Sequence, residues 1–170
     1  MRIEALKLVI VPEAQSADAE ALIARDELVA RVKREIQIIQ KCKSPTIVKL
    51  GSMQPSMVSI EGKDFIVYSE EFLEGDNLWT ILRNPANTPP SEEELKSLMF
   101  TFLTAIKELW EYRIIHRDIK PCNVIKTNDP ARQFVLLDLG IAFSRVDTPL
   151  THGWTPVTYR YFAPEMANPA

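Results

Sequence analysis

The residues best suited to chemistry lie in two short stretches of the second half of the chain. Residues 116–123 read His-Arg-Asp-Ile-Lys-Pro-Cys-Asn, and residues 138–140 read Asp-Leu-Gly. If the backbone between the stretches folds as a hairpin, two carboxylates, one amide and one ammonium group come within reach of a single phosphate group. Phosphoryl transfer asks a protein mainly for positioning and charge neutralisation, because the transferred group brings its own reactivity. The two stretches therefore predict phosphoryl transfer.

Both stretches match a known pattern. Residues 116–123 closely resemble the catalytic loop of protein kinases, and residues 138–140 resemble that family's magnesium-binding triplet, usually Asp-Phe-Gly. Ahead of them, Ala5-Leu6-Lys7 resembles the family's Val-Ala-Ile-Lys strand, and residues 34–50 resemble its C-helix and the strand after it. Residues 163–165 read Ala-Pro-Glu, the triplet that ends the activation segment. These landmarks occur in family order, so the chain is similar to a protein kinase catalytic domain.

The resemblance implies an α+β fold with two lobes, of which this chain would hold a part. Residues 1–75 would form a small antiparallel-sheet lobe with the hinge, and residues 76–170 the catalytic half of a helical large lobe. No Gly-x-Gly-x-x-Gly motif precedes Lys7, and the chain ends five residues after Glu165. We therefore expect a kinase domain truncated at both ends, without its first two strands and its last helices.

The composition predicts one globular domain, with 46% hydrophobic and 25% charged residues in a chain of 170. The net charge of −3 gives no support for nucleic acid binding, and no basic run suggests a membrane surface. No apolar run reaches the ~18 residues that span a bilayer. Cys42 and Cys122 lie far apart without a CxxC motif or a companion His cluster, which disfavours a disulfide or a zinc site. Two reduced thiols predict a cytoplasmic protein.

Hydrophobic periodicity and turn residues predict the elements that would position the site. The expected elements are a strand over residues 3–11, a helix from near residue 18 to residue 41, strands over residues 53–60 and 65–72 joined by a turn, short strands at residues 124–125 and 134–137 around a turn at residues 128–130, and an extended segment over residues 141–162. The last turn would make the hairpin that the two chemical stretches need.

A long amphipathic helix is expected over residues 91–113, and Ser91 and Glu94 form a capping-box pattern at its start. Its apolar residues recur at i, i+3 and i+4 spacing, and we expect them to be buried. They are Leu95, Leu98, Met99, Phe102, Leu103, Ile106, Leu109 and Trp110. Because the last helices of a kinase domain would be missing, we also expect the helix to expose one apolar face, a state that aggregates or recruits a partner.

The resemblance assigns catalytic roles to matching residues. Asp118 would accept or orient the proton of the attacking hydroxyl, and Lys120 would neutralise charge on the γ-phosphate. Asn123 and Asp138 would hold two Mg²⁺ ions, which prefer oxygen ligands. His116 would pack beneath the loop rather than act as a base. The apolar residues expected to stack with it are Leu139, Ile39 and either Met57 or Val58.

ATP is the implied co-substrate. Lys7 would hold its α and β phosphates, with Glu35 as the ionic partner of that lysine. The remaining ATP-binding residues are Ala5 and Ile125, which would sandwich the adenine, and Glu71 and Leu73, whose backbone groups would hold it. Glu70 departs from the family, because its gatekeeper position is usually apolar or Thr, and a carboxylate there would narrow or repel part of the adenine pocket. Asp76 has two readings, a ribose contact or the N-cap of a short helix.

The implied substrate is a protein with a Ser or Thr hydroxyl. Lys120-Pro121 is the Ser/Thr form of the catalytic loop, and Thr158 matches the threonine that bonds the catalytic Asp and Lys of such kinases. Arg117 favours a phosphate nearby, so we expect switching by phosphorylation of the activation segment. The candidate sites are Thr151 and Thr155, with Thr148 next. Glu165 would pair with an arginine beyond residue 170.

Two other functions stay open. A catalytically silent kinase-like scaffold is favoured by the missing phosphate-binding loop, by Glu70 and by Leu139, whereas the retained lysine, carboxylates and amide of the site argue against it. Magnesium-dependent nucleotide binding followed by phosphate transfer separates an enzyme from a scaffold. A small-molecule phosphotransferase of the same fold is the third reading. Such enzymes usually carry a Gly in place of Arg117 and lack an activation segment ending in Ala-Pro-Glu.

Overall fold

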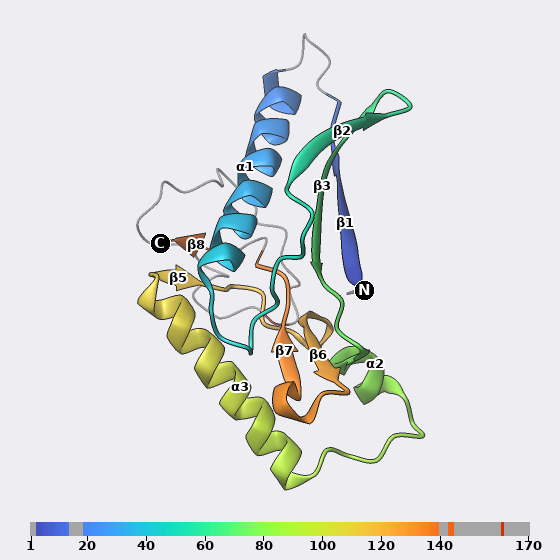
Figure 1. The fold of residues 1–170 in the computed structure, drawn as a ribbon, viewed down its shortest axis with the longest axis vertical. Helices are drawn as coiled ribbons and strands as arrows, with labels where there is room; N and C mark the ends of the chain where they lie inside the picture. The colour runs from blue at the N-terminus through green and yellow to red at the C-terminus, as the bar shows by residue number, and fades with distance from the viewer. Residues whose placement is uncertain (1–2, 14–18, 140–142, 145–160, 162–170) are drawn as a thin grey trace.

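The computed structural model describes residues 3–13, 19–139, 143–144 and 161 (Figure 1). Within these residues the strands form two three-stranded sheets and one two-stranded pair. The elements are β1 (Glu4–Val11), α1 (Ala19–Lys41), β2 (Ser56–Ile60), β3 (Lys63–Glu71), β4 (Gly75–Asn77), α2 (Leu78–Arg83), α3 (Glu92–Glu111), β5 (Ile114–Ile115), η1 (Pro121–Asn123), β6 (Val124–Thr127), η2 (Pro130–Arg132), β7 (Phe134–Leu136) and β8 (Phe143–Ser144).

The first sheet has the antiparallel order β1-β3-β2. β2 and β3 are joined at Glu61 and Gly62, whose φ angles of 51° and 78° suit a two-residue turn that follows the strand twist. The pairing of β1 with β3 sets Lys7 opposite Tyr68. Because alternate residues of a strand share a face, Glu70 lies on the same face as both.

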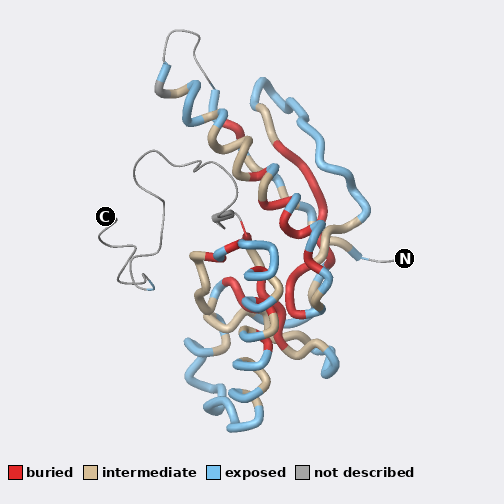
Figure 2. The backbone as a smooth tube through the Cα atoms, turned by 90° about the vertical axis from the view of Figure 1, so that its left-hand side faces the viewer, coloured by how far each residue is buried: buried red, intermediate tan, exposed pale blue. Residues whose placement is uncertain are grey.

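α1 lies alongside this face of the sheet (Figure 1). The buried apolar residues that join them are Val11, Val32, Ile36, Ile66 and Tyr68. In Figure 2 the buried segments of α1 and of the sheet lie side by side. The alternate residues Leu6, Leu8 and Ile10 of β1 are exposed. One face of the sheet is therefore core and the other is open among the described residues.

A larger core joins the end of α1 to α3 and to the β6–β7 hairpin. Its buried members are Ile38, Ile39, Cys42, Ile47, Val48, Ala105, Leu109, Ile114, Val124, Phe134, Val135, Leu136 and Leu139. Leu50 packs against both cores. The backbone N–H of Val48 donates to Leu136 O at 3.0 Å, and that of Leu136 donates to Thr46 O at 2.8 Å. The first and second halves of the chain are thus tied by packing and by backbone hydrogen bonds.

α3 has the predicted capping box: the Glu94 N–H donates to Ser91 Oγ at 3.2 Å, and the Ser91 N–H donates to Glu94 Oε2 at 2.9 Å. Its predicted burial was mostly wrong. Leu109 is buried, and Leu98 and Phe102 pack partly against the core. The other predicted core residues are 44–63% exposed: Leu95, Met99, Leu103, Ile106 and Trp110. The described elements that pack on α3, β5 and β7 among them, lie on its other side, so the second expectation, an exposed apolar face, is confirmed (Figure 2).

The other predicted elements are present with shifted bounds. The strand expected over residues 53–60 begins at Ser56, and the expected hairpin is the β6–β7 pair. Of the segment expected to be extended, 141–162, the described part is β8 and Tyr161. No helix in the described part of the chain is long and apolar enough to cross a membrane.

The C-terminal end of α1 is fixed to α3 by side chains that bind backbone groups. Glu108 accepts from the backbone N–H of Lys43 at 2.6 Å and from that of Ser44 at 3.0 Å. The Tyr112 hydroxyl donates to Lys41 O at 3.1 Å. The Tyr112 bond satisfies a carbonyl group that the helix leaves unpaired at its C-terminal end, and the Glu108 bonds fix the residues that follow the helix. The helix that carries Glu35 is therefore anchored to the half of the chain that carries the catalytic loop.

Candidate active site

His116 organises the stretch 116–123. Its ring is buried, its Nδ1 accepts from the Asp118 N–H at 3.2 Å, and its Nε2 lies 3.3 Å from Leu137 O. These partners select the neutral ring with its proton on Nε2, because Nδ1 must accept and a carbonyl oxygen can only accept. Burial lowers the pKa of His116, which keeps the ring neutral. The ring thus joins the loop to the end of the β6–β7 hairpin.

Asp118, Lys120 and Asn123 come together in this loop. The Asn123 Nδ2 donates to both Asp118 Oδ2 and Asp118 O at 3.0 Å, and Lys120 Nζ lies 2.6 Å from Asp118 Oδ2. Burial alone would lower the pKa of Lys120, but the hydrogen bond and the charge of Asp118 outweigh it and raise that pKa. The loop therefore holds a carboxylate, an ammonium group and an amide in direct contact.

The backbone is forced into the left-handed region at two positions of the site. Arg117 has φ 65° and Asp138 has φ 57°. A non-glycine residue there costs on the order of 1–2 kcal/mol, so the surrounding packing must hold both residues in place. Leu139, next to Asp138, is buried in the large core. The strained positions are those at which the chain turns functional side chains out of the packed interior.

Lys7 contacts two carboxylates. Its Nζ lies 3.2 Å from Glu35 Oε1, on α1, and 3.0 Å from Glu70 Oε1, on β3. Burial raises the pKa of both glutamates, and the charge of Asp138 raises each further, whereas Lys7 opposes this. Burial would lower the pKa of Lys7, but the two carboxylates outweigh it and raise that pKa well above its usual value. Asp138 therefore lies near enough to this cluster to act on it.

The structure brings Lys7 and Glu35 together, as the sequence predicted. The partner that sequence reasoning missed is Glu70, which faces Lys7. The signal that could have found it is the pairing of residues 4–11 with residues 63–71. In that antiparallel pair, Glu70 and the residue opposite Lys7 share a face, so Glu70 lies beside Lys7.

Glu71 is used structurally. Its carboxylate accepts from Arg132 Nη1 at 2.7 Å and Nη2 at 2.8 Å, and from the backbone N–H of Lys49 at 2.9 Å. Its own N–H donates to Lys49 O at 2.9 Å, so this N–H cannot also hold adenine.

Leu73 packs partly against the large core, and Ala5 and Ile125 are half-buried. Their predicted adenine contacts remain predictions.

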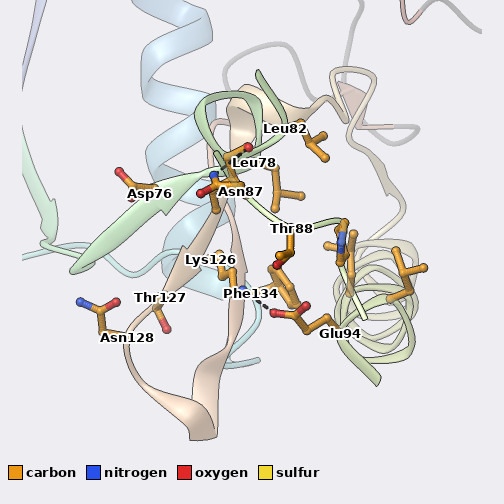
Figure 3. A pocket seen from close by; sticks show the side chains of 14 residues that line it. Asp76, Leu78, Leu82, Asn87, Thr88, Glu94, Lys126, Thr127, Asn128 and Phe134 are labelled. Atoms are coloured by element: carbon orange, nitrogen blue, oxygen red, sulfur yellow. Dashed lines mark hydrogen bonds and ion pairs between the residues drawn. The ribbon is translucent and has the colours of Figure 1, made fainter. Parts of the chain in front are cut away.

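The N-cap of α2 is Asn77 and not Asp76. The backbone N–H of Thr80 donates to Asn77 Oδ1 at 2.9 Å, so the cap reading of Asp76 was one residue early. Asp76 instead lines a pocket of about 450 Å³ between α2, the start of α3 and β6 (Figure 3). Glu94 and Lys126 form an ion pair in its wall. Lys7 and Asp118 do not line this pocket, so it lies apart from the predicted catalytic residues.

One predicted packing partner of His116 was wrong. Met57 and Val58 are 51% and 38% exposed, so neither belongs to a buried stack. Both lie on β2, at the open edge of the first sheet. Leu50 instead packs against the core that contains Ile39 and Leu139. The segment after α1 turns inward before β2 begins, which the sequence pattern did not reveal.

Several predicted residues cannot be placed. Thr148, Thr151, Thr155, Thr158 and Glu165 lie outside the described residues. Arg117 is half-buried, and burial followed by the charges of Arg31 and Arg34 lowers its pKa. The charges of Arg31 and Arg34, both on α1, therefore act on Arg117 in the catalytic loop.

The donors of the site fit Mg²⁺ bound together with a triphosphate. In the part of the chain that the structure describes, no group of three or more His, Cys, Asp or Glu side chains is arranged to hold a metal ion. Mg²⁺ is typically held by one or two carboxylates while phosphates and water complete its shell. Asp138 offers a carboxylate, and Asn123, whose amide nitrogen is bound to Asp118, offers an amide oxygen. The donor chemistry fits, with phosphate oxygens as the missing ligands.

Known proteins share this pattern. A family model described as the protein kinase domain matches residues 2–169. The chain is 31% identical over 140 residues to the inhibitor of nuclear factor kappa-B kinase subunit alpha of Xenopus tropicalis, which covers 78% of this chain and 18% of that protein. It is 29% identical over 144 residues to serine/threonine-protein kinase PrkC of Bacillus subtilis, with 84% and 21% covered. The chain spans about a fifth of the length of these relatives.

The fold also has a solved counterpart. A chain of the yeast RNA Pol II CTD kinase CTDK-1 complex aligns with a TM-score of 0.58 at 19% identity, covering 84% of this chain and 40% of that one. This likeness concerns the fold alone, and it confirms a partial two-lobed α+β kinase fold. Since the family model matches nearly the whole sequence, the chain belongs to the protein kinase family.

Proposed function

We propose that the chain is the catalytic part of an ATP-dependent serine/threonine protein kinase, which transfers the γ-phosphate of Mg-ATP to a protein hydroxyl. The observation that carries the proposal is the direct contact of Asp118 with Lys120 and Asn123 in one loop. The Lys7–Glu35 ion pair supports it from the other side of the site. Family membership supports protein kinase activity in general, and ATP, Mg²⁺ and the Ser/Thr preference are our extension.

Bound Mg-ATP supplies the phosphoryl group and the metal charge that offsets its oxygens. The chain's own residues position the reacting groups, accept a proton and balance charge. Asp118 accepts the proton of the attacking hydroxyl, and Lys120, held on the same carboxylate, neutralises charge at the transferred group. Lys7 holds the phosphates at the other end, and Asn123 and Asp138 hold the metal. Each role follows from the charge of the side chain and its place in the site.

The Ser/Thr preference is supported by Lys120-Pro121, and regulation by phosphate is supported by Arg117 with Arg31 and Arg34 nearby. A guanidinium group favours a phosphate as partner, and of the two arginines on α1, Arg31 is also paired with Glu27 at 3.6 Å. We propose Thr151 and Thr155 as the phosphorylated residues.

The chain's two cysteines are both free, which supports a cytoplasmic protein.

One observation favours the silent scaffold instead. Glu70 places a second carboxylate on Lys7, and a carboxylate competes with a phosphate for the same ammonium group. A scaffold of this kind would bind nucleotide weakly or not at all and would transfer no phosphate.

The test is a Mg-ATP phosphotransfer assay on the full-length protein with a generic basic protein as acceptor. We expect transfer to Ser or Thr that Asp138→Ala and Lys7→Met each abolish. Asp26→Ala and Lys63→Met, both at exposed positions, serve as matched controls and should retain transfer. Folded full-length wild-type protein that transfers no phosphate and binds Mg-ATP weakly or not at all would establish the scaffold.

A further inference from the structure

We propose that Glu70 is a second positioning residue for Lys7, which holds the lysine in the nucleotide-facing part of the site independently of α1. The inference rests on the proposed function for its consequence in catalysis, and on geometry for the contact itself. Lys7 Nζ lies 3.0 Å from Glu70 Oε1 and 3.2 Å from Glu35 Oε1. The glutamate from the sheet is therefore as close to the lysine as the glutamate from the helix.

The two carboxylates reach Lys7 from elements that are fixed in different ways. Glu70 belongs to β3, which is paired along its length with β1, the strand of Lys7. Its Cα partner is Ala5, two residues from Lys7, so sheet pairing places the two side chains on one face within reach of each other. Glu35 belongs to α1, which meets the sheet through apolar side chains such as Ile36 and through the ion pair of Arg25 with Asp64 at 2.9 Å. A displacement of α1 would break the Lys7–Glu35 pair and leave the Lys7–Glu70 pair intact.

Burial explains why Glu70 stays on the lysine. The side chains of Glu35 and Glu70 are each 7% exposed, whereas that of Lys7 is 32% exposed. A buried carboxylate needs a compensating charge, since its desolvation costs several kcal/mol. Lys7 is in contact with both carboxylates and supplies one positive charge between them. Lys7 donates a hydrogen bond to Glu35, whereas its contact with Glu70 Oε1 is an ion pair without hydrogen-bond geometry. The ammonium group has three N–H donors, so it keeps donors for a phosphate on its exposed side.

Two partners for one lysine predict redundancy. If either carboxylate alone keeps Lys7 in place, the loss of one should be tolerated and the loss of both should not. The same pair of residues would respond very differently if Glu70 merely drew Lys7 away from the phosphates. In that case Glu35 would be essential and the loss of Glu70 would increase activity.

The experiment is a double-mutant cycle of Glu35→Gln, Glu70→Gln and the two combined in the full-length protein, with exposed Glu74→Gln as the control. We expect each single substitution to raise KM for Mg-ATP by less than about 2-fold and the double substitution to raise it by at least about 50-fold, since residues that share a partner are strongly non-additive. The kcat at saturating Mg-ATP should change much less than KM. A single Glu35→Gln effect as large as the double, or a lower KM in Glu70→Gln, would overturn the proposal.

A second readout does not depend on catalysis. Reaction of Lys7 with trinitrobenzenesulfonate, followed by peptide mass spectrometry, reports how firmly the ammonium form is held, and exposed Lys63 gives an internal reference. With both carboxylates replaced, burial of Lys7 favours its neutral amine, which is the form that reacts with the reagent. We therefore expect Lys7 to be labelled at least about 10-fold faster than in wild type. Each single variant should stay within about 1.5-fold of wild type, because one carboxylate remains. Fast labelling in Glu35→Gln alone would overturn the role of Glu70, even in a protein that transfers no phosphate.

Discussion

Loss of Arg132 should destabilise the protein far more than loss of its partner carboxylate. The guanidinium donates to Glu71 at 2.7 and 2.8 Å, and its Nε donates to Pro45 O at 2.9 Å. The Glu71 side chain is 5% exposed, so Arg132→Ala leaves a carboxylate out of contact with water and without its balancing charge. Removing one partner of a buried pair costs about 3–5 kcal/mol.

The exposure of Arg132 decides where within about 3–5 kcal/mol the loss of stability in Arg132→Ala should fall. Its side chain is 23% exposed, so part of the interaction is screened by water and we expect about 3 kcal/mol. For a chain of this size that corresponds to a fall in Tm of about 6–12 °C. Glu71→Gln is the matched variant, because it removes the buried charge and leaves an arginine that water reaches. Its expected cost is about 1 kcal/mol.

Urea unfolding at pH 7 measures both variants against wild type. Arg132→Lys adds a further comparison, since it keeps the charge but loses the two-pronged geometry and should fall between the other two. Equal losses for Arg132→Ala and Glu71→Gln, or a loss below about 1 kcal/mol for Arg132→Ala, would refute the reasoning.

Three further stability predictions use the same unfolding assay. Ser91→Ala removes the α3 cap and should cost about 1 kcal/mol, and no change would contradict the capping box. Gly75→Ala would set a Cβ 2.1 Å from Lys126 O and should cost about 3 kcal/mol, whereas Gly62→Ala, with φ 78° and open space, should cost about 1 kcal/mol; equal losses would argue against the clash. Burial lowers the pKa of His116, so the unfolded chain binds a proton that the folded chain does not. This contribution to stability is complete above about pH 6.5 and is lost as the pH falls, by up to about 1.4 kcal/mol per pH unit. His116→Gln should flatten that slope between pH 7 and 5.5, and an unchanged slope would contradict this assignment.

The sequence predicted those elements whose signals are local. The strand around Lys7, the helix ending at Lys41 and the capped helix beginning after Ser91 each carry a periodic apolar pattern or a cap that needs no knowledge of the rest of the chain. The exposed face of α3 was harder to predict, because an apolar stripe indicates that another surface covers it but does not identify that surface. Met99 and Trp110 are apolar at the right spacing and are nevertheless exposed in the described structure.

Within the site, prediction succeeded for residues that belong to one contiguous motif. It failed for residues that are brought together by the pairing of distant segments. The loop from His116 to Asn123 is a contiguous motif, and the structure brings its side chains into contact. The contact of Glu70 with Lys7 depends on the pairing of strands far apart in sequence. Leu50 shows the same limit, because its inward position follows from the path of the chain between α1 and β2.

The central claim is that Asp118 does chemistry rather than hold the nucleotide, and one comparison tests it most directly. Asp118→Asn keeps the size of the side chain but removes the group that accepts the proton. We expect Mg-ATP affinity, measured by calorimetry, to stay within about 3-fold of wild type, while kcat for phosphate transfer falls at least about 100-fold. Transfer at the wild-type rate by the Asp118→Asn protein would contradict the account.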